Sequence, residues 1–455
     1  MAHILCMTTG LTGILHSSFE VVFRLEQAGH RVTYGCPQDV RAKVEAQGFT
    51  YRQMPPVVFD PDPSGAAGGK SGGSGGAFQK WTRVPARRKA AVRSLGMDDF
   101  ARILDELSPD LLLIDMELHD FVITALSRGV PVVLLSAWFS TWKRPGLPPL
   151  TSSLIPGPGL RHRLRIERHW WLRRRKEWKK DLSAKIRTGF TDRRSVLSYY
   201  ARSVGLPRRM FQRYDWPPPL LYRSLPVASM TPGALEFPHP VRPELEYVGP
   251  MVHTGRRDGA LEPGTDSALE EIFAKAKASG RAAILCSVSS MRTKDVDLLK
   301  RIAAAVAERP DWVMILGLGR SVEVETLGPL PDNVRVFPWI PQLRVLQHVD
   351  CCINPGGINT INECIHFGVP MLIYSGGLSD QDGCAARVAH HGIGIRGGKN
   401  DDAPKIRDNL QRVLTDVSIR RKVEELSAHC RSDEERRRLV DWVEARLPQS
   451  PRAGA

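Results

Sequence analysis

Residues 353–370, INPGGINTINECIHFGVP, place two adjacent glycines between the end of an apolar strand and the start of a helical pattern. A helix N-terminus carries unsatisfied amides and about half a positive charge, so it binds phosphate well. Gly356 and Gly357 would let an anion approach those amides, and Thr360 can add a hydroxyl. This pattern favours an anion site, with a simple turn as the alternative for the glycines.

Two carboxylates follow the glycines. Glu363 lies one helical turn after Asn359 and Thr360. It could accept two hydrogen bonds from a ribose diol, or it could be a solvated helix residue. Asp380 and Gln381 follow the strand 371–374 and a loop, and they offer acceptors for sugar hydroxyls. A helix N-cap is the alternative for Asp380.

An aromatic side chain and an amide precede the glycines. Trp339 ends a predicted strand and is followed by a proline turn. Because ligands of open parallel sheets bind outside the carboxyl ends of the strands, Trp339 could stack on a planar base. Gln342 could bind the polar edge of that base. A hydrophobic anchor beside a loop is the alternative for Trp339 alone, but it does not explain the whole series between residues 339 and 381.

These motifs resemble the donor signature of the UDP-glycosyltransferases, which are GT-B glycosyltransferases of the GT1-like type. That signature runs Trp-x-x-Gln, His-x-Gly-x-Asn-Ser-x-x-Glu, Gly-Val-Pro and Asp-Gln. Here it reads Trp339-Ile340-Pro341-Gln342, then Pro355 to Glu363, then Gly368-Val369-Pro370 and Asp380-Gln381. The resemblance extends over most of the chain, including residues 247–250.

The resemblance implies two Rossmann-like domains whose parallel sheets face each other across a cleft. It implies that Trp339 stacks on uracil and that Gln342 contacts the nucleoside. The diphosphate would be held by Asn359, Thr360 and the amides of Gly356 and Gly357, the ribose by Glu363, and the donor sugar by Asp380 and Gln381. Ser287 begins Ser287-Val288-Ser289-Ser290, which is similar to the Ser-x-Gly-Ser loop of the family.

Pro355 departs from the family, which usually has a diphosphate-contacting histidine at this position. Proline has neither a side-chain donor nor a backbone N–H, so one interaction with the ligand is lost or replaced. Arg292 or another basic group could supply the charge. We therefore expect altered handling of the donor, not loss of binding.

The catalytic base is also displaced. The family commonly has Gly-His after the first strand, whereas this chain has Gly13-Ile14 there and His16 two residues later. His16, delivered to the cleft by a loop, is the expected base, since its ordinary pKa suits proton abstraction. A helix-capping or surface role is the alternative for His16. Asp115, which closes the strand 111–114, is in the place of the family's aspartate that orients the histidine. Glu117, His119 and Asp120 crowd the same loop, so the base or its partner could be any of them. A loop cap is the alternative for Asp115.

The mechanism that follows is an inverting displacement. A base takes the acceptor proton while the acceptor oxygen attacks the anomeric carbon. Preorganised amides and the helix terminus stabilise the leaving diphosphate, so no metal and no cofactor besides the nucleotide-sugar substrate is expected.

Two series of alternating strands and helices must position these groups, which predicts an α/β protein with parallel sheets. The first series begins at residues 4–7, and its helix is expected from Ser17 on; the second begins at residues 282–286. We expect an acceptor-binding domain at 1–250, a nucleotide-sugar-binding domain at 251–432, and a C-terminal helix and tail at 433–455 that packs back on the first domain. A Pro-rich irregular stretch, 225–264, joins the halves, and the Gly-rich segment 60–76 is expected to be a flexible surface loop.

The length of 455 residues favours two domains, and no apolar run is long enough to span a membrane. Eight scattered cysteines without a CxxC pair, and an N-terminus without a secretory signal, indicate a reducing compartment. We therefore expect a cytoplasmic protein with a peripheral association on the inner membrane face. A metal site is not expected.

The net charge of +15 is concentrated in residues 161–187, a basic block that contains Trp170, Trp171 and Trp178. Leu164, Trp171, Trp178 and Leu182 would fall on one helical face. This pattern is typical of a helix in an anionic membrane interface, and the region corresponds to the acceptor-binding part of the family. A solvated helix packed by its tryptophans and a nucleic-acid surface are the alternatives, although no RNA-binding motif accompanies the block.

The leading hypothesis is an inverting glycosyltransferase that moves a sugar from a nucleotide-sugar, expected to be a UDP-sugar, to a hydroxyl of a lipophilic acceptor. The acceptor could be a lipid, a carotenoid, a sterol or a polyketide-like molecule. A GT-B auxiliary protein that binds without catalysis is the first rival. A binder of anionic lipid or nucleic acid that needs no donor is the second.

Overall fold

The computed structural model describes residues 1–57, 59, 84–212, 215, 220–257, 261–288, 295–319 and 322–448. The predicted surface loop at 60–76 lies outside these residues, as does Arg292. Within the described ranges, none of the helices combines the length and the hydropathy that a membrane crossing requires.

The N-terminal half is built on a seven-stranded sheet with the strand order β3-β2-β1-β4-β5-β8-β9, and all its neighbouring strands are parallel. Its strands are β1 (His3–Met7), β2 (Arg31–Cys36), β3 (Tyr51–Gln53), β4 (Leu111–Asp115), β5 (Val132–Ser136), β8 (Val227–Ser229) and β9 (Leu245–Tyr247). Its helices are α1 (Thr12–Gln27), α2 (Arg41–Glu45), α4 (Val84–Arg93), α5 (Met97–Leu107), α6 (His119–Ser127), α7 (Leu160–Thr188) and α8 (Arg193–Ser203). The short elements η1 (Arg208–Met210), β6 (Phe211–Gln212), β7 (Leu221–Tyr222) and η2 (Gly233–Leu235) complete it.

The C-terminal half is built on a six-stranded sheet with the order β12-β11-β10-β13-β14-β15, again parallel throughout. Its strands are β10 (Ala282–Ser287), β11 (Trp312–Gly317), β12 (Val334–Phe337), β13 (Cys351–Asn354), β14 (Met371–Ile373) and β15 (Gly394–Arg396). Its helices are α9 (Thr265–Ser279), α10 (Val296–Ala307), α11 (Gln342–Leu346), α12 (Ile358–Phe367), α13 (Gln381–His391), α14 (Ala403–Thr415) and α15 (Val417–Cys430), with η3 (Val324–Leu327). The two sheets confirm the predicted fold class.

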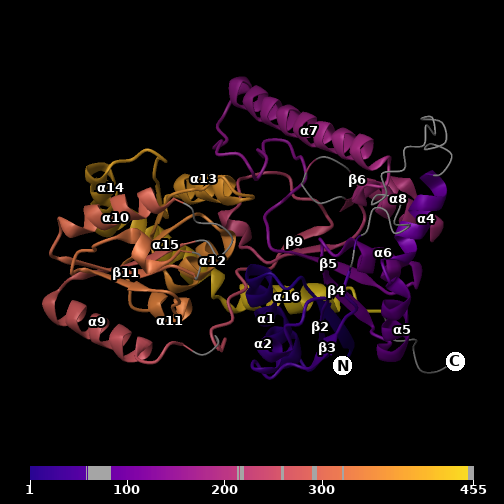
Figure 1. Cartoon of the computed structure of the whole chain (residues 1–455), viewed down its shortest axis with the longest axis horizontal. Helices are drawn as coiled ribbons and strands as arrows, with labels where there is room; N and C mark the ends of the chain where they lie inside the picture. The colour runs from indigo at the N-terminus through magenta and orange to yellow at the C-terminus, as the bar shows by residue number, and fades with distance from the viewer. Residues whose placement is uncertain are drawn as a thin grey trace, which may run out of the picture.

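The two halves lie side by side, with the C-terminal half in orange and the N-terminal half in indigo and magenta (Figure 1). One cluster of buried apolar side chains includes Leu5 and Ile114 of the first sheet and Leu285 of the second. The last helix, α16 (Asp433–Glu444), follows the C-terminal half in sequence but contacts α1. Its Leu439 and Val443 are buried in a cluster with residues of β1 and α1.

Two expectations about elements were wrong. Helix α1 begins at Thr12, so His16 lies inside a helix and not in a loop. The stretch 225–264 is not wholly irregular, because it supplies the edge strands β8 and β9 to the first sheet. Each of these strands has only three residues, too few to show an alternating pattern among the surrounding prolines.

Candidate functional site

The predicted donor residues meet where the strand order of the C-terminal sheet reverses. The chain proceeds from β10 to β11 and β12 on one side, and β13 then pairs with the other edge of β10. Ser287 ends β10, and Gly356 and Gly357 follow β13. Ligands of doubly wound sheets bind outside the carboxyl ends of the strands at this reversal.

The two glycines have different structural roles. Gly356 has φ +87°, and a Cβ there would lie 3.0 Å from the carbonyl oxygen of Gln381 and from Cγ2 of Ile373. Gly357 has φ −67° and is the N-cap of α12, and a Cβ there would meet no atom within 4 Å. The backbone therefore requires glycine at 356, whereas at 357 the open space beside the helix N-terminus suits an anion.

Four predicted donor residues form one hydrogen-bonded chain. The hydroxyl of Ser287 donates to Oε1 of Gln342 over 2.6 Å. The amide of Gln342 donates to the carboxylate of Glu363 and, over 3.4 Å, to Oγ1 of Thr360. The side chains of β10, α11 and α12 are thus locked together at the carboxyl edge of the sheet.

Arg256 joins this chain and was missed by the sequence reasoning. Its Nη1 donates to Oε1 of Glu363 over 3.1 Å, and both side chains are buried. Arg256 lies outside every helix and strand, shortly after the last strand of the N-terminal sheet. No periodicity marks such a residue, and the only signal was an Arg-Arg pair at the boundary between the halves.

Asp380 and Gln381 are engaged with the backbone. Oδ2 of Asp380 accepts from the N–H of Ile358, the first residue of α12, over 3.2 Å. Burial raises the pKa of Asp380. Oε1 of Gln381 accepts from the N–H groups of Gly376 and Leu378 and so fixes the loop that follows β14. Their predicted contacts with the donor sugar stay a prediction.

Trp339 is half-buried between β12 and α11, as expected of a side chain at the carboxyl edge of the sheet. Its stacking on a base stays a prediction. Pro355 is also half-buried, directly after β13. Because Arg292 lies outside the described residues, Arg256 is the buried cation that the structure places in the predicted donor network.

Asp115 lies at the corresponding reversal of the first sheet, between β1 and β4. Its Oδ2 accepts from the hydroxyl of Thr9 over 2.9 Å, and its Oδ1 accepts from the N–H of Glu117 over 3.0 Å. Burial raises the pKa of Asp115. Burial, together with the charge of Asp115, also raises the pKa of Glu117 to about 7.

His16 lies one turn into α1 and makes no side-chain hydrogen bond with Asp115 or any other described residue. Burial, together with charge repulsion from Arg256 and Lys43, lowers its pKa to about 3. Asp115 binds Thr9 in this structure, and no hydrogen bond joins it to His16. The role of Asp115 in orienting the base stays a prediction. The prediction that His16 is the base stays untested.

Helix α1 meets α12 directly. Ser17 donates to Oδ1 of Asn359 over 2.6 Å, and a Cβ on Gly13 would lie 2.4 Å from Nδ2 of Asn359. The predicted phosphate ligand Asn359 is thus held by the N-terminal half. This contact brings His16 and the start of α12 into one region, between the two sheets.

The tryptophans of the basic block do not share one role. Trp171 and Trp178 are exposed, but Trp170 is buried and its Nε1 donates to the carbonyl of Leu147 over 2.7 Å. The prediction that Trp170 contacts a membrane or an acceptor at the surface was wrong, because its ring anchors α7 to the protein.

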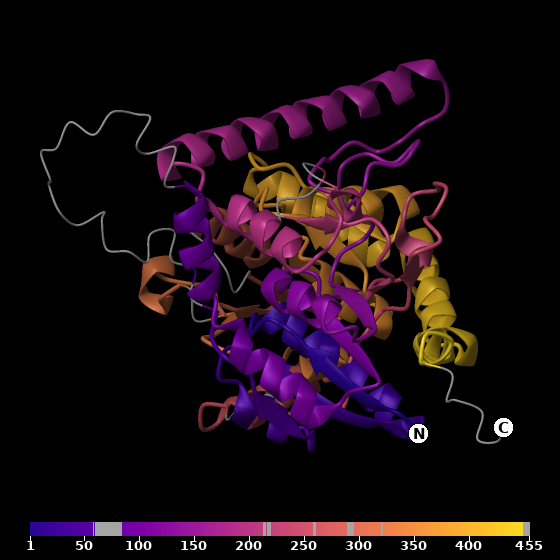
Figure 2. The ribbon, with the colours of Figure 1, turned by 90° about the vertical axis from the view of Figure 1, so that its right-hand side faces the viewer.

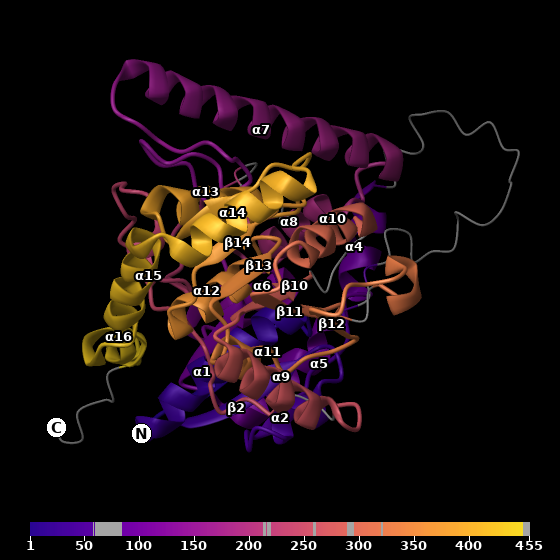
Figure 3. The same ribbon diagram turned by 90° about the vertical axis from the view of Figure 1, so that its left-hand side faces the viewer.

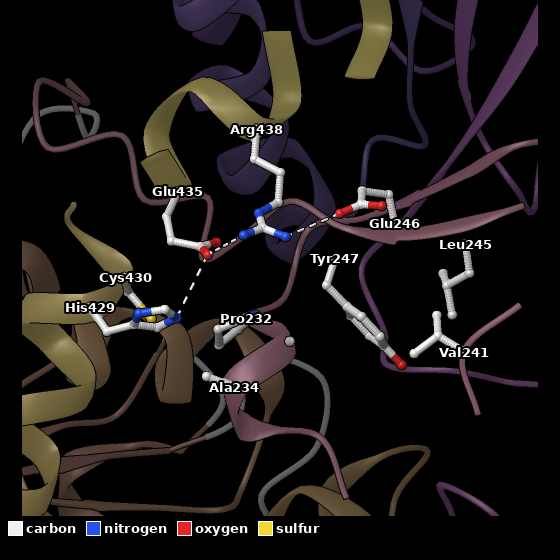
Figure 4. A pocket seen from close by; sticks show the side chains of 11 residues that line it. Pro232, Ala234, Val241, Leu245, Glu246, Tyr247, His429, Cys430, Glu435 and Arg438 are labelled. Carbon is white, nitrogen blue, oxygen red and sulfur yellow. Dashed lines mark hydrogen bonds and ion pairs between the residues drawn. The ribbon is translucent and has the colours of Figure 1, made fainter. Parts of the chain in front are cut away.

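One cavity of about 450 Å³ lies away from these residues, between η2, β9 and the last two helices (Figure 4). Arg438 crosses its wall and pairs with Glu246 and Glu435. None of the predicted site residues lines it. Among the described residues no group of three or more His, Cys, Asp and Glu side chains is placed to hold a metal ion.

Comparisons with known proteins find similarity to glycosyltransferases. Residues 304–445 match the family described as erythromycin biosynthesis protein CIII-like, C-terminal domain. The chain is 26% identical to the oleandomycin glycosyltransferase of Streptomyces antibioticus, over 98% of this chain and 91% of that protein.

Solved structures show the same fold. The glycosyltransferase of kitacinnamycin is similar with a TM-score of 0.67 and 22% identity, covering 98% of this chain and 99% of its own. The glycosyltransferase VinC in complex with dTDP is similar with a TM-score of 0.59 and 18% identity, covering 98% of each chain. The chain therefore has the GT-B fold and is similar over nearly its whole length to glycosyltransferases.

Proposed function

We propose that this glycosyltransferase moves a sugar from a nucleoside-diphosphate sugar to a hydroxyl of a lipophilic, polyketide-like acceptor, with inversion at the anomeric carbon. The observation that carries this proposal is the linked set Ser287, Gln342, Thr360 and Glu363 beside the open N-terminus of α12. These groups match, in type and position, what a nucleoside and a diphosphate need.

The reaction would proceed as one displacement. A base takes the proton of the acceptor hydroxyl, the acceptor oxygen bonds to the anomeric carbon, and the bond from that carbon to the diphosphate oxygen breaks. The N–H groups at the start of α12 would take up the developing negative charge. Arg256 would add positive charge from the side of Glu363, so we expect the activity to persist in the presence of EDTA.

UDP is the expected nucleotide, and dTDP is the alternative that the dTDP complex of VinC favours. The acceptor class is supported by two similar proteins, the oleandomycin glycosyltransferase and the spinosyn rhamnosyltransferase SpnG, which was solved with the spinosyn aglycone. We expect Trp339 to stack on the pyrimidine, which both nucleotides contain.

The test is a thermal-shift and transfer experiment on the whole chain. UDP-, dTDP- and GDP-sugars are compared on the wild type, on Glu363→Ala and on the surface control Glu424→Ala. We expect a pyrimidine nucleotide-sugar to raise the Tm of the wild type and of the control but not of Glu363→Ala. Equal stabilisation of all three proteins would contradict the prediction that Glu363 binds the ribose.

The rival function is an auxiliary protein that binds the donor without catalysis. Pro355 and the engagement of Asn359 by Ser17 are the observations that favour it. Mass spectrometry of reactions with a panel of hydrophobic alcohols separates the two functions. Donor binding without transfer and without donor hydrolysis would establish the rival.

A further inference from the structure

Helix α7 is a long helix at the outside of the molecule. Its 29 residues run from Leu160 to Thr188, between the caps Gly159 and Gly189, which corresponds to about 44 Å at 1.5 Å per residue. Two opposite views, each perpendicular to that of Figure 1, show it lying across one edge of the protein, beyond both sheets (Figures 2 and 3). Only one side of this helix is covered by the rest of the chain.

The inward side of α7 is fixed by specific contacts. Ile166 and Trp170 are buried, and Nη1 of Arg173 donates to Oγ1 of Thr151 over 2.9 Å. Two of the three acidic residues of the helix, Glu177 and Asp181, are also buried on this side. The rotation of the helix about its axis is therefore set by the fold.

The outward side of α7 carries apolar side chains in positions spaced by four and seven residues. Their exposed fractions are 60% for Leu164, 57% for Trp171, 49% for Trp178, 40% for Leu182 and 68% for Ile186. A shallow hollow lies on the C-terminal half of this side, between Leu182 and Ile186. Such a continuous exposed apolar stripe marks an interaction surface.

Basic residues flank the stripe. The helix has twelve lysines and arginines against three acidic residues, a net charge of +9 out of +15 for the chain. Since Glu177 and Asp181 face inward, Glu167 is the one exposed acid, and Lys143 pairs with it. The surface that α7 presents is thus apolar and cationic.

We propose that the outward side of α7, with Leu164, Trp171, Trp178, Leu182 and Ile186, docks on an anionic lipid surface. Tryptophan side chains prefer the headgroup depth of a bilayer, and lysine and arginine stems reach from there to lipid phosphates. A second copy of the chain is disfavoured by the charge of +9 on each helix. A nucleic acid would use the basic groups but leave the aliphatic side chains in water.

The docked helix would bring the lipid next to the region between the halves. The segment beneath α7 includes Leu147 and Leu150, and a Cβ on Gly383 of α13 would lie 1.8 Å from the carbonyl oxygen of Leu150. Helix α13 begins at the predicted sugar-binding residue Gln381. Entry of the acceptor from the lipid rests on the proposed function, whereas docking does not require it.

The test uses flotation of the whole chain with vesicles of phosphatidylcholine alone or mixed with phosphatidylglycerol. We expect binding to the anionic vesicles, at least tenfold weaker binding to the neutral ones, and weakening by salt. Trp171→Ala/Trp178→Ala should reduce binding at least tenfold, whereas the control Val241→Ala/Val417→Ala, at two exposed apolar positions elsewhere, should not change it.

The charge part of the surface is tested separately. Lys176→Gln/Lys179→Gln should weaken binding to anionic vesicles about thirtyfold, and the control Arg421→Gln/Lys422→Gln on α15 should not. Unchanged thermal unfolding of each variant shows that the fold is intact. Transfer to a water-soluble acceptor should be unaffected, so a failure of docking and a failure of the proposed function are distinguishable.

Four results would overturn the proposal. The first is equal binding of neutral and anionic vesicles, and the second is wild-type binding by Trp171→Ala/Trp178→Ala. The third is binding of a single-stranded RNA oligonucleotide at the same protein concentration, provided that the RNA displaces the vesicles and that Trp171→Ala/Trp178→Ala binds it more weakly. Self-association that this variant abolishes would instead assign the surface to a second copy.

Discussion

At the scale of the residue, burial shifts the pKa values of His16 and Glu117 in opposite directions. Burial disfavours the charged form of each group, so the histidine is neutral at pH 7 and the carboxyl is partly protonated. The charge of Arg256 lowers the pKa of His16 further, and the charge of Asp115 raises that of Glu117. A base must be deprotonated to act, so the two candidates give different pH profiles.

With His16 as the base, kcat/KM should stay level on the acid side from about pH 8 down to about pH 5, because the pKa of His16 is about 3. His16→Ala should reduce kcat by about a hundredfold or more, and Glu117→Gln should leave the shape of the profile unchanged. If kcat/KM instead falls by about tenfold per pH unit below pH 7, and Glu117→Gln removes this fall, then Glu117 is the base.

At the scale of the element, the N-terminus of α12 is where the two halves and the predicted phosphate site meet. Asn359 is hydrogen-bonded to Ser17 of α1, and the N–H of Ile358 is bonded to Asp380 at the start of α13. Helix α1 and the start of α13 thus hold this terminus in place. Because Gly357 has no side chain, the space beside the N–H groups of the α12 terminus stays open.

Gly357→Ala should leave the free energy of unfolding unchanged to within about 0.5 kcal/mol, because its φ is ordinary and the space is open. It should weaken donor binding about tenfold or more, since the methyl group would occupy the predicted diphosphate space. Calorimetric titration with the nucleotide-sugar and chemical denaturation give the two quantities.

Gly356→Ala is the matched comparison. It should cost about 1–2 kcal/mol of stability, because L residues disfavour its left-handed φ and its Cβ would crowd the carbonyl of Gln381. Wild-type donor affinity in Gly357→Ala would contradict the placement of the diphosphate. Equal stability losses in both variants would contradict the separate roles of the glycines.

At the scale of the whole molecule, a buried ion pair connects the halves. Nη2 of Arg387 in α13 lies 2.5 Å from Oε1 of Glu236, and both side chains are almost fully buried. The guanidinium also lies between Phe139 and Phe237, with its carbon 4.7 and 4.6 Å from the ring centres. Such a pair is costly to break, because the remaining charge stays buried.

Arg387→Met should therefore lower the free energy of unfolding by about 3–5 kcal/mol, measured by chemical denaturation. Arg407→Met on α14 breaks a partly exposed pair with Glu308 and should cost about 1 kcal/mol at most. A loss in Arg387→Met no larger than that of Arg407→Met would show that the pair does not hold the halves together.

The two alternating α/β series, the helix that starts after Gly357 and the donor motifs were predictable from the sequence. Each of them is encoded in consecutive residues, as apolar runs, breakers and spacings that follow the period of a strand or a helix. The structure describes all eight cysteines, and each of them is buried.

Tertiary structure alone decided which distant groups meet and which side of an element is covered. The partners of Arg256, Asp115 and Asn359 lie far away in the chain, so no local pattern identifies them. Trp170 and Trp171 are adjacent on one helix, and the packing of that helix, which includes the bond from Trp170 to the carbonyl of Leu147, determines which of them is buried. Local periodicity fixes the elements, whereas the contacts between elements depend on packing across the whole molecule.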